Sequence, residues 1–234
     1  MVRHLVTASV PTDGTMRRMN KVAVIGSGQV GQVLADGFLK HGYQVKRGTR
    51  EPAKLADWQA KAGAGASVGT FADAAAFGDL VVLAVKGTVA EAAVDLCDGK
   101  LAGKTVLDAT NPLKDAPPAN GVVGFFTNLD DSLMERLQRR APAAHFVKAF
   151  SCVGSGMMVN PDYGGTKPSM FICGDNAGAK EEARVILDKF GWETEDMGGA
   201  AAARAIEPLC MLWCIPGFLR NSWTHAFHLL KKQT

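Results

Sequence analysis

The chain has 234 residues, of which 47% are hydrophobic and 21% are charged. A chain of this length and apolar content can bury a full core, as one large domain or as one domain with a small appendage, so a disordered or fibrous protein is excluded. The formal net charge is only +3 and the basic residues are scattered, so nothing in the composition predicts binding to nucleic acid.

Neither the cysteines nor the apolar segments indicate export or membrane insertion. The five cysteines form no CxxC pair and have no regular spacing, as is typical of reduced thiols in a cytosolic protein. Residues 1–18 lack a sustained apolar segment and are predicted to be an N-terminal tail. The longest apolar run, Leu209 to Leu219, is too short for a bilayer and contains Pro216. We therefore expect a cytoplasmic protein without a membrane segment.

Short runs rich in Val, Ile and Leu alternate with longer amphipathic stretches through the first half of the chain. Strands are predicted at Lys21–Gly26, Gln44–Thr49, Ala66–Thr70, Asp79–Val85 and Lys104–Thr110. Helices are predicted at about Val30–His41, Pro52–Ala62, Phe71–Gly78 and Val89–Cys97. Five strands joined by helices predict a parallel sheet with right-handed crossovers, covered on both faces.

The second half continues with a less regular pattern. A helix near Asp130–Arg140 is followed by three more predicted strands, with a helix near Ala177–Phe190 before the last of them. These strands are His145–Phe150, Ser169–Gly174 and Trp192–Met197. The remainder is predicted to be helical from about Ala200 to Lys231, kinked or broken at Pro208 and Pro216. One domain, residues 19–199, with a C-terminal helical extension, residues 200–234, is the simplest description.

The sequence GSGQVG, residues 26–31, directly follows the first strand and opens the first helix. It fits the pattern G-x-G-x-x-G, in which the first glycine permits a tight turn, the second lets the backbone approach a pyrophosphate and the third allows close packing of helix on sheet. The helix N-terminus offers free N–H groups to the anion. The residues predicted to hold a dinucleotide here are Gly26, Ser27, Gly28, Gln29, Val30 and Gly31.

The end of the second strand predicts which dinucleotide binds. An NAD site places Asp or Glu there for the ribose 2′-hydroxyl, but this chain has Gly48 and Thr49. Thr49 can donate a hydrogen bond to a 2′-phosphate, and Arg50 can bind the phosphate in a fork and stack on adenine. This pattern favours NADP(H).

Three charged neighbours of this turn have open roles. Arg47 and Lys54 are either helpers at the phosphate or solvated surface charges. Glu51 is a competing feature that can face ribose, but its position just before Pro52 favours a role at the N-terminus of the next helix.

Ligands of open parallel sheets lie at the carboxyl ends of the strands, so the loops after the fourth and fifth strands should border the cofactor. The first of these loops begins with Val85 and Lys86, and the second contains Asn111 and Pro112. Asn111 either contacts a ribose or the nicotinamide or forms an Asn-Pro turn.

Several motifs in a fixed order, spread over about residues 19–219, resemble one family. They are GSGQVG, RGTREP, DATNPL, VKAFSCVGSGMMVNP, ICGDNAGAK and DMGGAAAARAIEPL. The chain resembles the NADPH-dependent oxidoreductases that act with coenzyme F420, a deazaflavin, and is similar also to the cytosolic reductase domain of the six-transmembrane metalloreductases. The resemblance implies an α/β, Rossmann-like NAD(P)-binding domain with a mostly parallel sheet of about eight strands, usually dimeric.

The resemblance also implies the roles of individual residues. NADP(H) would lie on the glycine loop, with its 2′-phosphate held by Thr49 and Arg50, and a deazaflavin would stack against the nicotinamide. The loop after the sixth strand would approach the nicotinamide amide through backbone groups of Ser151, Cys152, Val153 and Gly154. Ser151 stands where many relatives have Asn, and the C-terminal end departs from the family pattern, which leaves the hydride acceptor open.

Three functions therefore remain in view. The first is hydride transfer between NADPH and a flat acceptor such as F420 or a flavin, which requires placement of two rings rather than an acid–base residue. The second is reduction of another small molecule, such as a ketone, an imine or a ferric chelate. The third is a non-catalytic NADPH sensor.

The C-terminal segment is expected either to stack on the acceptor or to form a homodimer interface, and the interface is the favoured reading. Its aromatic side chains are Trp213, Phe218, Trp223 and Phe227. His225 and His228, three apart on a predicted helix, are read as surface or packing residues rather than as metal ligands.

Overall fold

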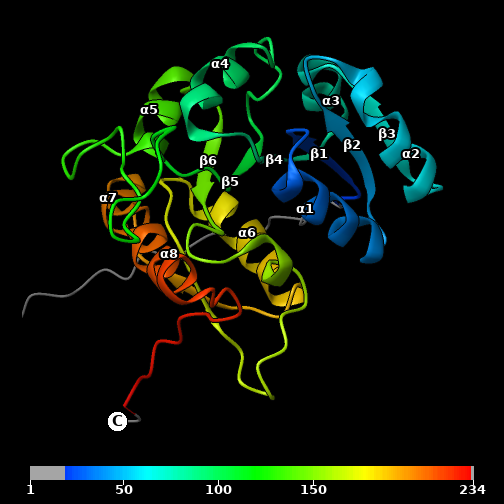
Figure 1. The fold of residues 1–234 in the computed structure, drawn as a ribbon. Helices are drawn as coiled ribbons and strands as arrows, with labels where there is room; N and C mark the ends of the chain where they lie inside the picture. The colour runs from blue at the N-terminus through cyan, green and yellow to red at the C-terminus, as the bar shows by residue number, and fades with distance from the viewer. Residues whose placement is uncertain (1–18, 233–234) are drawn as a thin grey trace, which may run out of the picture.

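The computed structural model describes residues 19–232, so the predicted tail, residues 1–18, lies outside the described residues. Six strands form a parallel sheet in the order β3-β2-β1-β4-β5-β6 (Figure 1). The strands are β1 (Lys21–Ile25), β2 (Gln44–Gly48), β3 (Ala66–Gly69), β4 (Leu80–Leu83), β5 (Thr105–Asp108), β6 (His145–Lys148), β7 (Ser169–Ile172) and β8 (Glu193–Asp196).

Helices connect the strands and cover the sheet. The α-helices are α1 (Gln29–Lys40), α2 (Ala56–Ala62), α3 (Phe71–Phe77), α4 (Ala90–Asp95), α5 (Leu133–Arg140), α6 (Ala177–Lys189), α7 (Ala203–Ile206) and α8 (Leu209–Arg220). The 3-10 turns are η1 (Pro52–Leu55), η2 (Gly87–Val89), η3 (Ser155–Met157) and η4 (Ala200–Ala202). Pro52 thus opens its helical segment, where its missing N–H costs nothing.

The sheet separates two hydrophobic cores. Along β1 the side chains alternate between them because successive residues of a strand point to opposite faces: Val22 and Val24 join one core, and Ala23 and Ile25 the other. The first core also contains side chains of α1, α2 and α6, and the second contains side chains of α3, α4, α5 and α7. Right-handed crossovers on both faces produce this arrangement.

The predicted fold class is confirmed, with a difference in the sheet. The main sheet has six strands, and β7 and β8 form a separate parallel pair. One antiparallel bridge, between Lys148 at the end of β6 and Cys173 just after β7, connects the pair to the main sheet. The eight predicted strands all exist, but a single bridge is too short to make them one sheet.

The C-terminal prediction is wrong beyond Arg220, because the helix ends there and residues 222–232 are irregular. Asn221 adopts the left-handed conformation with φ 52°, which Asn tolerates better than most residues and which ends helices. Trp223 then folds back: its indole N–H donates to Asn221 Oδ1, and its ring packs against Gly217. Trp223 thus packs partly onto α8, whereas Leu229 and Leu230 of the same segment stay exposed.

The three last helical segments follow one another as a run, Ala200–Arg220, that is long and apolar enough to cross a membrane. This run is longer than the apolar stretch seen in the sequence, because the turns before Pro208 join it. Core helices meet the same length and composition criteria. Three side chains of this run, Cys210, Trp213 and Cys214, are buried against Cys152 of the loop after β6.

A buried ion triad connects the sheet to the C-terminal helices. Lys148 Nζ, which is fully buried, lies 2.6 Å from Asp108 Oδ2 and 2.9 Å from Glu207 Oε1. It also donates to the carbonyl of Thr110 at 2.9 Å. Burial alone would lower the pKa of Lys148, but the two carboxylates more than offset this and hold the pKa above its usual value. Lys148 is therefore charged, and it neutralises both the Asp108 carboxylate at the end of β5 and the Glu207 carboxylate just before α8.

Replacing Lys148 by Met should lower the free energy of unfolding by about 3–5 kcal/mol, because Asp108 and Glu207 would be left as uncompensated buried charges. Urea denaturation measures this loss. The matched control is Lys167→Met, which removes only an exposed ion pair with Asp188 and should change the stability little. Equal stability of Lys148→Met and wild type would contradict the role given to the triad.

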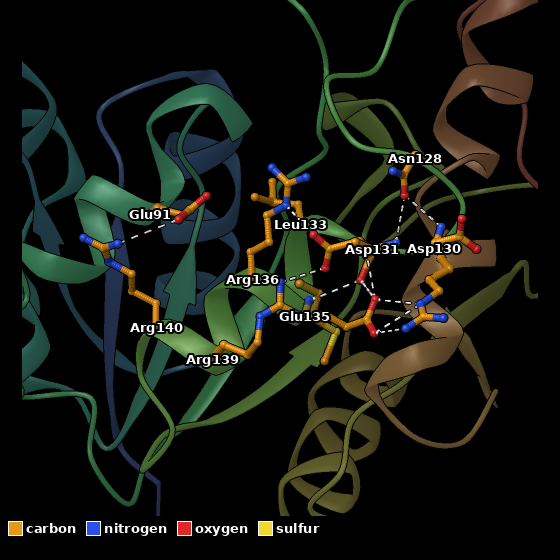
Figure 2. Close-up of polar contacts among 12 residues, drawn as sticks. Glu91, Asn128, Asp130, Asp131, Leu133, Glu135, Arg136, Arg139 and Arg140 are labelled. Carbon is orange, nitrogen blue, oxygen red and sulfur yellow. Dashed lines mark hydrogen bonds and ion pairs between the residues drawn. The ribbon is translucent and has the colours of Figure 1, made fainter.

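Acidic side chains gather at the N-terminus of α5, among them Asp131 and Glu135 (Figure 2). Ser132 and Glu135 form a capping box, and the Glu207 carboxylate accepts the N–H groups of Leu133 and Met134, both at 3.0 Å. Asp131 pairs with two arginines one and two turns further along the helix, and Glu135 pairs with Arg204 of α7. These contacts satisfy the free N–H groups of the helix start and oppose its positive partial charge.

This site predicts a specific dependence of stability on pH. Hydrogen bonds from Arg204 lower the pKa of Glu135 from 4.5 to about 2, although burial opposes the shift. A depressed carboxylate pKa stabilises the fold fully above the unfolded-state pKa, and this stabilisation is lost as the pH falls from 4.5 towards 2. Wild type should therefore exceed Glu135→Gln in stability at neutral pH, and the difference should shrink across that window in thermal unfolding.

The matched variant for this experiment is Arg204→Met, which removes the main cause of the shift while leaving the carboxylate in place. It should flatten the same part of the pH profile. A gap between wild type and Glu135→Gln that stays constant down to pH 2 would contradict the assignment.

Candidate functional site

Two glycines of the loop between β1 and α1 are required by the fold itself. Gly26 has φ 144°, and a Cβ there would collide with the carbonyl oxygen of Ala84. At Gly31 a Cβ would lie 2.7 Å from the carbonyl oxygen of Gly26, so only glycine lets α1 approach the sheet this closely. Both positions behave as the G-x-G-x-x-G pattern predicts.

Gly28 is different, because nothing within residues 19–232 requires a glycine there. Its φ is −77°, which any residue can adopt, and a Cβ at this position would meet no atom within 4 Å. Gly28 also caps the N-terminus of α1 without any side-chain hydrogen bond to the first turn. The open space before these N–H groups therefore fits an anionic group brought close to the backbone, such as a pyrophosphate.

Gly28 opens onto a cleft of about 410 Å³ at the carboxyl ends of β4 and β5. We call it the main cleft, and it lies between the glycine loop and the loops after those two strands. Its lining residues are Gly28, Gln29, Val30, Ala84, Val85, Lys86, Gly87, Ala109, Asn111, Leu113, Lys114 and Asp115. Of the residues predicted from the sequence, the main cleft brings together Gly28, Gln29, Val30, Val85, Lys86 and Asn111.

Asn111 joins the main cleft to the loop after β6. Its side-chain Nδ2 donates to the carbonyl oxygen of Ser151 at 3.2 Å. Its Oδ1 and the Ser151 Oγ are both buried and have no hydrogen-bond partner among the described residues. Two unused polar atoms beside a cleft fit a polar ligand group, such as a carboxamide or a ribose. Pro112 does not line the cleft; it is buried behind it, with its carbonyl accepting from Phe126.

The loop after β6 carries four predicted site residues, Ser151, Cys152, Val153 and Gly154, none of which lines the main cleft; the loop meets it through the hydrogen bond from Asn111 to Ser151. It begins at Phe150, a buried bulky residue with φ 60°, which costs energy and marks a tight change of direction. Val153 is also buried. The thiol of Cys152 packs away from the cleft, and burial raises its pKa to about 12, so it stays neutral. A Cβ at Gly154 would lie 2.7 Å from the Trp213 ring, so the C-terminal helix presses against this loop.

The turn after β2 holds the residues predicted to bind a 2′-phosphate. Thr49 is buried and its hydroxyl accepts from the N–H of Glu51, whereas Arg50 is exposed. Lys54 forms an exposed ion pair with Glu51 at 2.8 Å. Glu51 stands at the start of η1 but makes no capping hydrogen bond with its side chain. Its carboxylate instead holds Lys54 beside the turn.

Arg47 is not a solvated surface charge, because it is only 1% exposed. One of its nitrogens donates to the carbonyl oxygens of Gly26 and Gly28, and its guanidinium lies over the Trp58 ring. The burial of Arg47 could have been predicted from the alternation of side chains along a strand. Arg47 is two residues after the core residue Val45, so its side chain points to the same face of the sheet.

Two methionines follow the loop after β6: Met158 is buried in the first core, and Met157 packs against that core at its edge. His225 and His228 lie in the irregular segment rather than on a helix, and their rings contact the carbonyl oxygens of Trp213 and Lys167. The Trp213 ring stacks on His225 and contacts Trp223.

A parallel sheet, a glycine turn at the start of α1 and a cleft at the carboxyl ends of the strands define a protein of the Rossmann-type dinucleotide-binding class. Residues 21–112 match the sequence profile of the family described as NADP oxidoreductase, coenzyme F420-dependent. A solved structure, a candidate F420-dependent NADP-reductase from Arthrobacter sp. FB24, superposes with a TM-score of 0.84, with 30% identity, 91% of this chain and 100% of that chain covered. The chain belongs to this family of NADP-dependent oxidoreductases.

Two other relatives are more distant. The rat metalloreductase STEAP3 is 28% identical over 229 residues, which cover 90% of this chain, and the chain spans only 42% of the length of that protein. An imine reductase from Streptomyces aurantiacus has a TM-score of 0.61 and 19% identity, covering 85% of this chain and 63% of that one, which indicates a shared fold.

Replacing Gly28 by Val should abolish binding of NADPH and NADH alike, because the new side chain would occupy the space before the helix N-terminus. Isothermal titration calorimetry measures both affinities, and the unfolding temperature should be unchanged because a Cβ at this position meets no protein atom within 4 Å. Gly178→Ala is the control, since Gly178 lies in the first turn of α6, does not line the cleft, and a Cβ there would meet only the side chain of Asn176, at 3.3 Å. Retained binding in the Val variant would exclude this loop as the pyrophosphate site.

Replacing Arg50 by Ala should weaken NADPH far more than NADH, by about 1.5–3 kcal/mol, which is the value of a charge-assisted hydrogen bond. The ratio of the two dissociation constants is the measurement. Lys46→Ala, a partly exposed charge on the neighbouring strand, should leave the ratio unchanged. Equal losses for both cofactors would contradict the assignment of Arg50 to the 2′-phosphate.

Proposed function

We propose that this protein transfers hydride between NADPH and a flat acceptor, such as coenzyme F420 or a flavin. The observation that carries the proposal is Gly28, a glycine that the fold does not need, opening onto the main cleft at the N-terminus of α1. The family assignment supports the cofactor, and the family description supports the acceptor. When bound, NADP(H) supplies the hydride chemistry.

The residues of the chain would then bind and orient. The N–H groups of the glycine loop would receive the pyrophosphate, while Thr49 and Arg50, with Lys54, would receive the 2′-phosphate. Asn111 Oδ1 would accept a hydrogen bond from the nicotinamide end, and the Ser151 hydroxyl would donate or accept one, since both atoms are buried and unused. The buried residues Cys152 and Val153, with the partly buried Gly154, would exclude water from that end.

The acceptor would occupy the side of the main cleft opposite the glycine loop. Hydride transfer between two rings depends on their placement, and it needs no proton carrier in the cleft. Asp108, the carboxylate at the end of β5, is committed elsewhere: its Oδ1 accepts the N–H and the hydroxyl of Thr110, and its Oδ2 pairs with Lys148. We therefore assign it to positioning of the loop and not to proton transfer.

We also propose that the enzyme works as a homodimer in the cytoplasm. Exposed apolar side chains gather on α8 and the segment after it, and a second copy would bury them. They are Leu212, Phe218, Leu219, Trp223, Leu229 and Leu230.

The deciding experiment mixes the purified protein with NADPH and F420 without oxygen and follows the visible absorbance of the deazaflavin. Rapid bleaching, absent in the Gly28→Val variant, is the expected result. If NADPH binds and F420 is not bleached, the F420 assignment is wrong, and the same assay with flavins, ferric chelates, imines and ketones identifies another acceptor. Turnover with none of them would indicate an NADPH sensor.

A further inference from the structure

Arg47 lies beneath the glycine loop as a buried cation that neither the fold nor the family assignment explains. Its Nη2 is 3.3 Å from the carbonyl oxygen of Gly26 and 3.2 Å from that of Gly28. Its guanidinium carbon is 4.8 Å from the centre of the Trp58 ring. The Trp58 indole N–H donates to Asp36 of α1 at 2.7 Å, so the ring that supports Arg47 is itself held in place.

Burying this charge costs stability. Desolvation lowers the pKa of Arg47, and Asp36 only partly compensates. The Nε–H of Arg47 is buried and has no hydrogen-bond partner among the described residues. An apolar side chain would fill the same space between β2 and Trp58 without an unpaired donor. Core packing is therefore a poor reason for an arginine here.

The geometry of the peptide bond suggests a reason for an arginine at this position, because its two contacts are to backbone carbonyls of the glycine loop. In a trans peptide the C=O of one residue and the N–H of the next point in opposite directions, and no cis peptide bond is present among the described residues. Turning the carbonyls of Gly26 and Gly28 towards Arg47 therefore turns the N–H groups of Ser27 and Gln29 away from it. These N–H groups lie at the exposed side of the loop, where an anion would bind.

We propose that Arg47 is a positioning residue for the cofactor: it holds the Gly26–Ser27 peptide plane of the glycine loop so that its N–H group faces the pyrophosphate. At Gly28 it adds a second contact to a carbonyl that already accepts the Gln32 N–H of α1. This inference rests on the proposed function. It assigns Arg47 to the part that NADPH and NADH share, in contrast to Arg50, which is assigned to the 2′-phosphate alone. Arg47 touches the loop from below and need not touch the ligand.

The test compares Arg47→Met, Arg47→Lys and Arg50→Ala by calorimetric titration with NADPH, NADH and ADP-ribose. Arg47→Met should weaken all three by about tenfold to a hundredfold, the equivalent of one charge-assisted hydrogen bond. Arg47→Lys should recover part of the loss, because an ammonium can still donate to a carbonyl. Arg50→Ala should weaken NADPH and leave ADP-ribose unchanged.

Chemical rescue separates positioning from a merely structural role. Arg47 lines a groove of about 510 Å³ between α1 and α2, so Arg47→Ala should open space that connects with it. Millimolar guanidinium should then restore much of the affinity of Arg47→Ala for ADP-ribose, while sodium at equal ionic strength should not. The same salt should have no such effect on Arg50→Ala with NADPH, because that side chain is exposed.

The possible results separate the positioning role of Arg47 from the proposed function. Unchanged affinity of folded Arg47→Met for ADP-ribose overturns the positioning role and leaves the proposed function intact. A loss confined to NADPH would instead make Arg47 a 2′-phosphate ligand and also overturn it. If wild type bound no dinucleotide, both proposals would fail. Failure of F420 reduction alone would not affect this inference, because binding is its only measured quantity.

Discussion

The positive charge of Lys148 is the constraint on which the second half of the molecule depends. A fully buried ammonium is tolerated only with partners, and its two carboxylates come from positions 108 and 207, at the end of β5 and just before α8. Glu207 also fixes the position of α5, since its carboxylate accepts the first N–H groups of that helix. One cation thus fixes the sheet, α5 and the C-terminal helices relative to each other.

The same triad reaches the main cleft in two short steps. Asp108 accepts hydrogen bonds from Thr110, whose carbonyl is held by Lys148, and the next residue is Asn111, which contacts Ser151. The far wall of the cleft is therefore attached to a rigid, charged centre, while the near wall is attached to Arg47 beneath the glycine loop. Two buried cations, one under each wall, position backbone and amide groups that carry no charge of their own.

The sequence was sufficient for features that depend on local periodicity. The strands of the parallel sheet and the glycine loop follow from runs of apolar residues and from glycine spacing, both of which are short-range. The sequence was insufficient for features that depend on contacts between residues far apart in the chain. Nothing near Lys148 in the chain indicates Glu207, 59 positions away, and helix propensity did not reveal that Asn221 would end α8 in a left-handed conformation. All eight strands were predicted, but not their division into a sheet of six and a separate pair. The two sheets are joined by a single bridge at Cys173, which no local sequence pattern indicates.

The C-terminal segment packs against the loop after β6, which the proposed function assigns to the nicotinamide end of the cofactor. Gly154, at the end of the loop after β6, has no room for a side chain because the Trp213 ring lies against it. Trp213 is fixed in turn by His225, which stacks on it and receives its indole N–H through the backbone carbonyl. The segment after α8 therefore supports the nicotinamide end of the proposed site from behind. If the proposed function holds, a change in that segment would alter which flat molecule fits against the nicotinamide, while the residues assigned to the cofactor, in the loops after β1, β2, β4 and β5, would stay the same.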